Sequence, residues 1–344
     1  MDSRRPTSAD VAALAGVSRT TVSFVLNGRD VTISPATRER VLDAARQLGS
    51  HPSSPARQLA RGRTNTIALM LRRTPEEVAG DAFLPELLRG LTIAARNAGY
   101  QVIVETVEPS SGRYEEVIRA HRADGLVVSG PRSGDPELAR LVREGVPLVV
   151  QGWVPDLEVA SVDVDNRVGA LRAVEHLIAL GHQRIGCITN APRDFTSASE
   201  RLAGYHAALR EARVEAGPEW VVEGSFDAAS GRKAMARLLA QVDPTAVFVA
   251  SDTVAVGAMS ALREAGQKVP SAMSVVGFDD IPLAAHLDPP LTTVRLPGFE
   301  LGQTVARVLL DRIGGPSVPT RTLLPTELIV RASTGPPGRF GASP

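Results

Sequence analysis

Apolar residues between positions 7 and 27 recur with helical spacing, and a glycine interrupts them once. Thr7 stands three residues before Asp10, so each side chain can cap backbone donors at the start of a helix. The apolar positions that fall on one face of this helix are Val11, Leu14 and Ala15. Gly16 can adopt the left-handed conformation of a tight turn, with Val17 buried beneath it. The pattern predicts a helix that ends in a sharp turn.

A second and a third helix are predicted after the turn. Ser18 can cap the second helix, whose inward positions are Val22, Val25 and Leu26. Ser34 as N-cap and Pro35 at the first helical position begin the third helix, which ends at Gly49. A helix, a turn and a helix form the unit that places a short helix in the DNA major groove, although any three-helix bundle shows a similar pattern.

The distribution of charge favours the first of these interpretations. Residues 1–63 carry ten arginines and five acidic residues, a net charge of +5. The rest of the chain carries −5, so the charge of the whole chain is zero. A basic head on an acidic body favours attraction of one end to phosphate groups. We therefore expect the first three helices to bind DNA.

From Thr64 onward, short apolar runs alternate with amphipathic segments. The first predicted strands are Ile67–Leu71, Val102–Val107 and Leu126–Ser129, and helices are predicted near 84–98 and 113–121. The strands are continuous and β-branched, as buried parallel strands require. With about 270 residues remaining, two α/β lobes that face a cleft are more plausible than one large domain.

The motifs of common enzymes are missing from the sequence. It contains no GxxxxGK[ST] phosphate loop, no GxGxxG opening a helix after a strand, no GxSxG nucleophile elbow and no HExxH zinc helix. Asp163 and Asp165 alternate along a strand-like segment, so their side chains diverge and form a poor acid and base pair. We therefore expect no catalysis, no cofactor and no bound metal.

The sequence also predicts where the protein is found. The single cysteine, Cys187, lies in an apolar run and is typical of a buried thiol in a reducing compartment. The N-terminus is rich in arginine and has no apolar run, so neither a signal peptide nor a membrane span is expected. We expect a cytoplasmic protein, not an exported ligand-binding protein.

The chain resembles the lactose/galactose repressor (LacI/GalR) family of bacterial transcription regulators over nearly its whole length. The motifs near the N-terminus are Ala15-Gly16-Val17-Ser18, Thr21-Val22-Ser23 and Asn27. Those of the body are ELLRG at 86–90, SVDVDN at 161–166, RLAGY at 201–205, SVVGFDD at 274–280 and PLTTV at 290–294. The resemblance implies an all-α helix-turn-helix headpiece and a hinge. The implied body is a two-lobed α/β structure with parallel sheets and three crossovers, similar to periplasmic sugar-binding proteins.

The resemblance also implies which residues contact DNA. The implied base-reading residues are Arg19, Thr20 and Phe24. The implied phosphate contacts, which position the protein without reading sequence, are Thr7, Ser18, Thr21, Asn27 and Arg38. Many relatives carry a basic residue where this chain has Phe24. A phenylalanine can pack on a thymine methyl group, or it can fold back over the domain.

Residues 51–65 have the Pro-, Ser- and Arg-rich composition of a linker. They also resemble the family's hinge, a short helix that orders on operator DNA and inserts a leucine into the minor groove. Leu59 and Ala60 occupy those positions. Such a wedge favours a flexible pyrimidine–purine step at the centre of the DNA site. A flexible tether is the alternative interpretation.

By the same resemblance, the cleft binds a small-molecule effector. The implied contacts are Phe83, Trp153, Arg201, Phe226, Ser251, Asp252 and Asp279. Phe83 would supply an aromatic wall, Arg201 a fork for hydroxyl or carboxylate groups, and Asp279 a hydroxyl acceptor. These groups predict a sugar or sugar derivative. A nucleoside or a small acid remains an alternative ligand, and a structural role remains an alternative for Asp252.

The expected organisation is a headpiece at 1–50, a hinge at 51–64, an effector-binding and dimerisation body at 65–334, and a disordered tail at 335–344. The expected lobes are about 65–163 with 294–322, and about 164–292 with 324–334, with crossovers near 163–166, 291–295 and 322–326. The implied mechanism is ligand-controlled binding of a homodimer to a pseudo-palindromic operator, usually as a repressor. The ligand could release the protein from DNA or act as a corepressor, and an activating role is a further alternative.

Overall fold

The computed structural model describes residues 6–26, 33–49, 63–107, 114–155, 157–315 and 321–338. The chain forms two compact units, Met1–Asn65 and Thr66–Pro344. We call the first unit the headpiece and the second unit the body, and each is described by itself.

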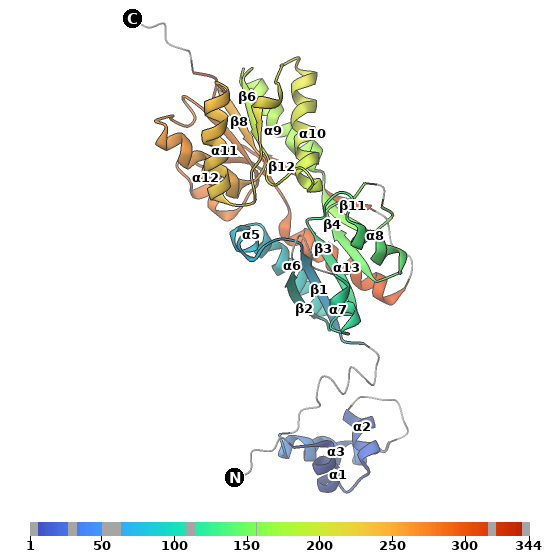
Figure 1. The fold of residues 1–344 in the computed structure, drawn as a ribbon. Helices are drawn as coiled ribbons and strands as arrows, with labels where there is room; N and C mark the ends of the chain where they lie inside the picture. The colour runs from blue at the N-terminus through green and yellow to red at the C-terminus, as the bar shows by residue number, and fades with distance from the viewer. Residues whose placement is uncertain are drawn as a thin grey trace, which may run out of the picture. The chain divides into compact units, whose positions relative to one another are not determined.

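Three helices form the headpiece: α1 (Ser8–Ala15), α2 (Arg19–Leu26) and α3 (Pro35–Gln47) (Figure 1). Their core is made of small apolar side chains, which are Val11, Ala12, Ala15, Val22, Val25, Val41, Ala44 and Ala45. The backbone N–H and the hydroxyl of Thr7 both donate to the Asp10 carboxylate at 2.7 Å. Gly16 has a φ of +66°, which is the left-handed turn that the sequence predicts. The predicted helix-turn-helix is therefore confirmed.

One inward position of the headpiece is predicted incorrectly. Leu14 is 51% exposed, and Ala12 is buried in its place. Both residues lie at the edges of the apolar stripe that contains Val11 and Ala15. The packing of α2 and α3 against α1 decides which edge is covered, and the periodicity of one helix carries no information about this.

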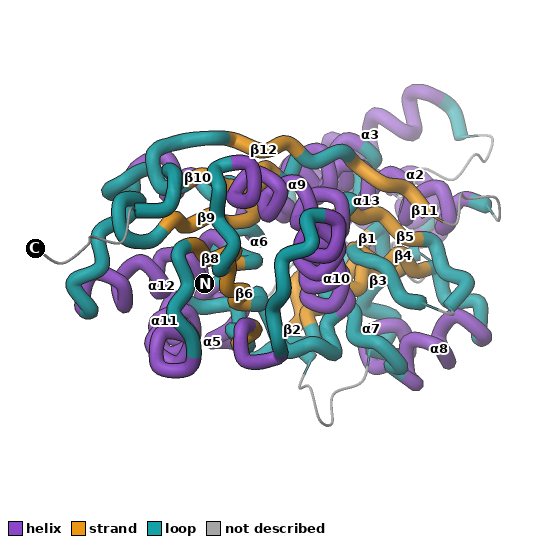
Figure 2. The backbone as a smooth tube through the Cα atoms, turned by 90° about the horizontal axis from the view of Figure 1, so that it is seen from above, coloured by secondary structure: helices purple, strands orange, loops and turns teal. Residues whose placement is uncertain are grey.

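The body contains two six-stranded sheets with helices on their faces (Figure 2). The first sheet has the order β11-β5-β4-β3-β1-β2. Its strands, all parallel, are β1 (Thr66–Leu71), β2 (Gln101–Thr106), β3 (Gly125–Ser129), β4 (Leu148–Gln151), β5 (Ser161–Val164) and β11 (Arg321–Leu324). Its helices are α5 (Pro75–Gly80), α6 (Leu84–Asn97), α7 (Glu115–Arg119), α8 (Pro136–Arg143) and α13 (Gly298–Gly314). We call this half of the body the first lobe.

The second lobe has the sheet order β12-β10-β9-β8-β6-β7. Its strands are β6 (Ile185–Ile188), β7 (Val221–Val222), β8 (Ala246–Val249), β9 (Ser274–Asp279), β10 (Thr292–Arg295) and β12 (Glu327–Ile329). Its α-helices are α9 (Asn166–Ala179), α10 (Thr196–Glu211), α11 (Ala228–Gln241) and α12 (Asp252–Glu264), with short 3₁₀ helices at Pro218–Trp220 and Pro282–His286. Only β12 is antiparallel to its neighbour among the strands described. The predicted α/β fold class is confirmed.

The chain crosses between the two sheets three times, after Val164, after Arg295 and after Leu324. The first crossing lies in the range that the sequence predicts. The second lies beyond 291–295, because β10 remains paired with β9 as far as Arg295. Residues 294 and 295 therefore belong to the second lobe instead of the first.

The described part of the C-terminal segment is held against the second lobe. The backbone of Gly335 hydrogen-bonds to the Ser274 hydroxyl, and its carbonyl lies 2.8 Å from Nε2 of His182. The expected disordered tail begins at 335, whereas the structure describes the chain as far as residue 338.

Across the described ranges, no single helix is long and apolar enough to span a membrane. The helices Ser8–Ala15 and Arg19–Leu26 meet the length and composition criteria together, but a bend of 104° separates them.

Candidate functional site

The start of α2 presents the polar surface that the sequence assigns to DNA reading. Arg19 and Thr20 are exposed there, and Phe24, further along α2, is half-buried. The Ser18 hydroxyl accepts the backbone N–H of Thr21 at 3.0 Å and lies 2.9 Å from the Thr21 hydroxyl. Two of the expected phosphate contacts therefore also form the N-terminal cap of α2, which fixes their positions at the helix start.

The other expected DNA contacts are divided between described and undescribed parts of the chain. Thr7 is exposed at the cap of α1, and Arg38 is half-buried on α3. Asn27, Leu59 and Ala60 lie outside the described residues.

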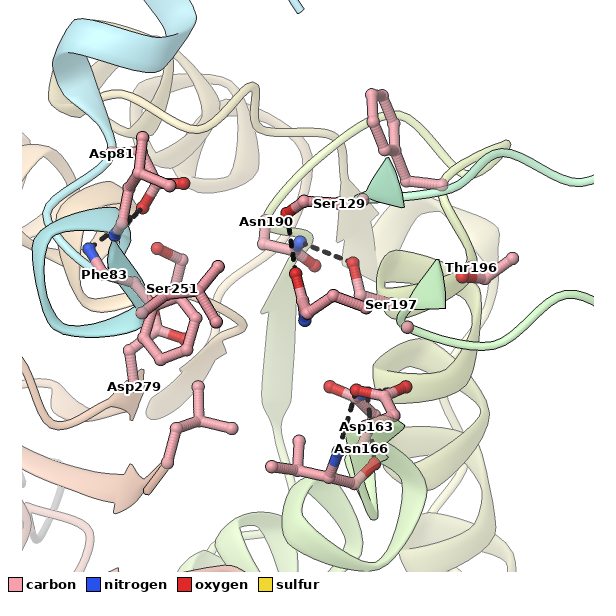
Figure 3. Close-up of a pocket in the computed structure, with 18 of the residues that line it drawn as sticks. Asp81, Phe83, Ser129, Asp163, Asn166, Asn190, Thr196, Ser197, Ser251 and Asp279 are labelled. Atoms are coloured by element: carbon pink, nitrogen blue, oxygen red, sulfur yellow. Dashed lines mark hydrogen bonds between the residues drawn. The ribbon is translucent and has the colours of Figure 1, made fainter. Parts of the chain in front are cut away.

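A pocket in the body is lined by residues from both lobes (Figure 3). Many of its polar residues stand at or just after the carboxyl ends of strands. In the first lobe these residues are Ser129, Gln151 and Asp163, and in the second lobe they are Asn190, Ser251 and Asp279. Ligands of open parallel α/β sheets bind at this edge, where the strand ends and the following helix starts converge. The pocket is therefore the candidate effector site.

Arg201 lies at the centre of the hydrogen bonds in the pocket. Its Nε donates to Asn166 Oδ1 at 2.8 Å, and one terminal nitrogen donates to the Ala250 carbonyl at 2.6 Å and to Asp279 at 3.3 Å. Its guanidinium also lies over the Phe278 ring, 3.9 Å from the centroid. Burial lowers the pKa of Arg201, and the neighbouring carboxylates oppose this effect. Arg201 is thus fixed in one orientation between α9, β8 and β9 before any ligand binds.

Burial is also the main influence on the carboxyl groups of the pocket. It raises the pKa of Asp163 to about 6, although the Val164 N–H, Arg201 and the Asn166 amide favour the charged form. Burial likewise raises the pKa of Asp279, which Arg201 opposes. The protonation of this pocket is therefore sensitive to mildly acidic pH.

Two phenylalanines of the second lobe lie between two arginines of the first. Phe195 and Phe226 meet edge to face, with ring centroids 5.0 Å apart. The Arg73 guanidinium is 4.8 Å from the Phe226 ring centroid, and that of Arg132 is 4.3 Å from the Phe195 centroid. Phe226 has a φ of +60°, an uncommon conformation for a large side chain. These four side chains connect the lobes beside the pocket.

Five of the seven effector contacts expected from the sequence line the pocket: Phe83, Arg201, Phe226, Ser251 and Asp279. Trp153 does not line it, because its ring packs under the Arg321 guanidinium at 4.4 Å. Asp252 does not line it either. It is buried, and it accepts the Ile281 N–H at 3.0 Å and the Thr293 hydroxyl at 2.6 Å.

The sequence analysis did not assign several residues of the pocket. The unassigned polar or charged ones are Arg73, Asp81, Ser129, Gln151, Asp163, Asn166, Asn190, Thr196 and Ser197. A usable signal was present for part of this set, because a polar residue directly after a buried strand marks the ligand edge of an α/β sheet. No group of three His, Cys, Asp or Glu side chains able to hold a metal ion occurs within the part of the chain that the structure describes.

The headpiece and the two-lobed body together define a class of protein, the DNA-binding regulators with a ligand-binding body. Residues 7–53 match the model of bacterial regulatory proteins of the lacI family, and residues 174–334 match the periplasmic binding protein-like domain. The HTH-type transcriptional regulator CelR of Thermobifida fusca is 40% identical over 96% of this chain and 98% of its own length. The transcriptional repressor CytR of Escherichia coli K12 is 36% identical over 95% and 96%.

Solved structures agree with this assignment. A CelR–cellobiose complex superimposes with a TM-score of 0.72 and 38% identity over 96% of this chain and all of that chain. The lac repressor dimer bound to operator and the anti-inducer ONPF gives a TM-score of 0.85 and 33% identity over the same shares. The chain belongs to the lacI family of DNA-binding transcriptional regulators. It is therefore a regulator and not an enzyme.

Proposed function

We propose that this regulator is a repressor whose affinity for operator DNA is controlled by a neutral sugar bound between the lobes. The observation that carries the proposal is the pocket, in which aromatic side chains lie beside a fixed arginine and several oxygen acceptors. Aromatic faces suit the apolar face of a sugar ring, and the polar groups suit its hydroxyls. The cavity volume is about 90 Å³, which is below the roughly 300–1,000 Å³ of most small-molecule sites, so the lobes would open wider around a sugar than they do in this structure. The cellobiose complex of CelR supports a sugar of this kind.

Contacts between the lobes can couple the pocket to the headpiece. Arg132 of the first lobe pairs with Asp194 of the second at 2.8 Å, and the Thr196 N–H donates to the Pro131 carbonyl at 3.3 Å. A ligand that binds the closed arrangement more tightly shifts the population of lobe arrangements toward it. Coupling between two such sites is typically about 1–3 kcal/mol.

On the DNA side, Arg19, Thr20 and Phe24 are proposed to read bases, and Leu59 with Ala60 to enter the minor groove. The phosphate contacts proposed are Thr7, Ser18, Thr21, Asn27 and Arg38. A homodimer would read two half-sites about one helical turn apart. The lac repressor dimer on its operator supports this arrangement. The DNA target implies a cytoplasmic site of action.

Selection of bound duplexes from a random DNA pool tests the DNA side of the proposal. We expect enrichment of a pseudo-palindrome with a flexible central step. Arg19→Ala should reduce the preference for one base at a symmetric pair of operator positions. The expected loss is about 1–3 kcal/mol in the binding free-energy difference between that base and the others. Arg38→Ala should weaken binding to all sequences alike, whereas Arg40→Ala, on the exposed surface of α3, is the control. Enrichment of sequences without two-fold symmetry would contradict the dimeric reading of DNA.

Titration of the selected operator in the presence of cellobiose, glucose or ribose tests the effector. We expect at least one sugar to change operator affinity about fivefold or more. Asp279→Asn should retain operator binding and lose this response, whereas Asp311→Asn, exposed on α13, should behave as the wild type. A normal response in Asp279→Asn would remove the pocket from the mechanism.

A further inference from the structure

The charged groups that line the pocket are mostly already paired within the protein. Arg73 donates to Asp81 at 2.6 Å, and Arg201 pairs with Asp279 at 3.3 Å. The fifth charged group is the Asp163 carboxylate, which is held by the Asn166 amide and a backbone N–H. Three carboxylates and two guanidiniums therefore line the pocket, and each guanidinium has a carboxylate partner, although the Nε of Arg73 has no hydrogen-bond partner among the residues described.

Asn190 adds an unused hydrogen-bond acceptor to this pocket. The residue is 4% exposed and follows β6. Its backbone carbonyl accepts the Phe226 N–H at 2.8 Å, and its Nδ2 donates to the Ser197 hydroxyl at 3.2 Å. Its Oδ1 has no hydrogen-bond partner among the residues described. Figure 3 shows the Asn190 amide with its hydrogen bond to Ser197.

A buried acceptor without a donor destabilises the ligand-free protein, and a ligand O–H or N–H relieves this penalty. A carboxylate or phosphate group has only acceptor oxygens, so at Asn190 and Asp163 it would meet further acceptors. Burial makes such a mismatch more unfavourable than it would be in water. The groups available in the pocket therefore favour ligands that donate hydrogen bonds and carry no negative charge.

We propose that Asn190 is an effector-binding residue that determines specificity, accepting a hydrogen bond from a hydroxyl or amine of the ligand and selecting neutral or amino sugars over phosphorylated or carboxylated sugars. This inference rests on the proposed sugar-binding function. The bond from Nδ2 to Ser197 orients the side-chain amide, and the Phe226 N–H holds the Asn190 backbone, so Ser197 is a positioning residue for Asn190.

The test is calorimetric titration of the full-length protein with cellobiose, glucose, glucosamine, gluconate and glucose 6-phosphate. We expect the wild type to bind at least one neutral or amino sugar and neither anion. For that sugar, Asn190→Ala should weaken binding about tenfold or more, the range for an unsatisfied buried partner. Ser197→Ala should weaken it less, and Asn97→Ala, which makes the same change at an exposed site on α6, should not alter it.

Two further measurements separate a binding role from a structural one. The melting temperature of ligand-free Asn190→Ala should be close to that of the wild type, because loss of the bond to Ser197 and removal of an unsatisfied acceptor oppose each other. A monodeoxy analogue that lacks the contacted hydroxyl should bind wild type and Asn190→Ala equally weakly, so the two losses are not additive.

The outcomes distinguish the two proposals. A wild type that binds none of the five compounds would overturn the sugar effector and this inference with it. If the wild type and Asn190→Ala bound the same sugar equally tightly, this inference alone would be overturned. A preference of the wild type for an anionic sugar would have the same consequence. A marked fall in the melting temperature of ligand-free Asn190→Ala would also overturn it, because Asn190 would then be structural.

Discussion

In each lobe of the body, a pair of helices crosses so closely that only glycine can occupy the contact. In the first lobe, a Cβ added to Gly302 on α13 would lie 2.1 Å from the Leu87 carbonyl oxygen of α6. In the second lobe, a Cβ added to Gly257 on α12 would lie 1.7 Å from the Ala228 carbonyl oxygen of α11. Both lobes therefore use the same device to bring two helices together, in addition to their similar strand orders.

The two lobes differ in what surrounds these crossings. In the first lobe, α6 and α13 pack on the sheet through a continuous apolar cluster that includes Leu87, Leu91 and Leu309. In the second lobe, the buried Asp252 of α12 connects the Ile281 backbone with the Thr293 hydroxyl of β10. The stability of the first lobe thus depends mainly on filled volume, whereas that of the second also depends on satisfied hydrogen bonds.

The helix crossings should produce the largest effects, and similar ones in both lobes. Gly257→Ala and Gly302→Ala each force a methyl group against backbone, so we expect a loss of about 3 kcal/mol or more in the free energy of unfolding of the body. Urea denaturation measures this loss. Gly314→Ala is the control, because no atom lies within 4 Å of its added Cβ. If Gly257→Ala were as stable as this control, the close crossing would not be needed.

The second largest effect should be the pH dependence of stability that the buried carboxyl groups cause. Burial raises the pKa of Asp163 to about 6, so the folded protein keeps a proton that the unfolded chain loses near pH 4. The free energy of unfolding should therefore fall as pH rises from 4 to 6 and level off above that. Each pKa unit corresponds to about 1.4 kcal/mol, so Asp163 should contribute about 3 kcal/mol to this fall in the free energy of unfolding.

Asp163→Asn should remove the contribution of Asp163 to the pH dependence of the free energy of unfolding. The contribution of Asp252 and Asp279 should remain, because burial also raises their pKa values. Urea denaturation between pH 4 and 8 measures the difference. An unchanged pH profile in Asp163→Asn would show that this carboxyl titrates normally.

In the second lobe, a loss of stability caused by removing one partner of a buried hydrogen bond should be partly reversed by removing the other partner as well. Asp252→Ala leaves the Ile281 N–H and the Thr293 hydroxyl unsatisfied, and we expect a loss of about 2 kcal/mol. Adding Thr293→Val removes one of these groups and should recover part of the loss. Leu91→Ala in the first lobe has no polar partner to remove, so only refilling of its volume can restore its stability. A double variant no more stable than Asp252→Ala would contradict this distinction.

Much of the fold could be predicted from the sequence because its signals are local. Thr7, Asp10 and Gly16 encode the first helix and its turn within ten residues, and continuous β-branched runs mark the buried strands. Arg201 and Asp279 are 78 residues apart in sequence, and only the family resemblance placed both in the pocket.

The errors in the site have geometric causes. Ser251 is the extended N-cap of α12 and Asp252 is its first helical residue, and of these two neighbours only Ser251 lines the pocket. Trp153 follows Gly152, which lines the pocket with a φ of +122°, and the indole packs on Arg321 from a distant part of the chain. The unused acceptor of Asn190 is a property of the folded surroundings and has no counterpart in sequence.

The contact between the lobes should produce the smallest effect on stability. The Arg132–Asp194 pair is partly exposed, with side-chain exposures of 26% and 47%, and such pairs contribute about 0–1 kcal/mol. Arg132→Gln should therefore leave the free energy of unfolding nearly unchanged, since it alters neither core. It removes the ion pair and the cation contact with Phe195, both of which form only when the lobes meet. We expect effector binding to weaken about threefold, which corresponds to about 0.6 kcal/mol.

Calorimetric titration with the effector sugar and urea denaturation of the same sample measure both quantities. Arg140→Gln is the matched control, because Arg140 lies on α8 of the first lobe and its carboxylate neighbours, Glu137 and Glu144, belong to that lobe. If Arg132→Gln destabilised the protein as strongly as Asp252→Ala, the lobes would not have separate cores joined by a weak contact. If it changed neither quantity, closure around the ligand would depend on the residues that line the pocket alone.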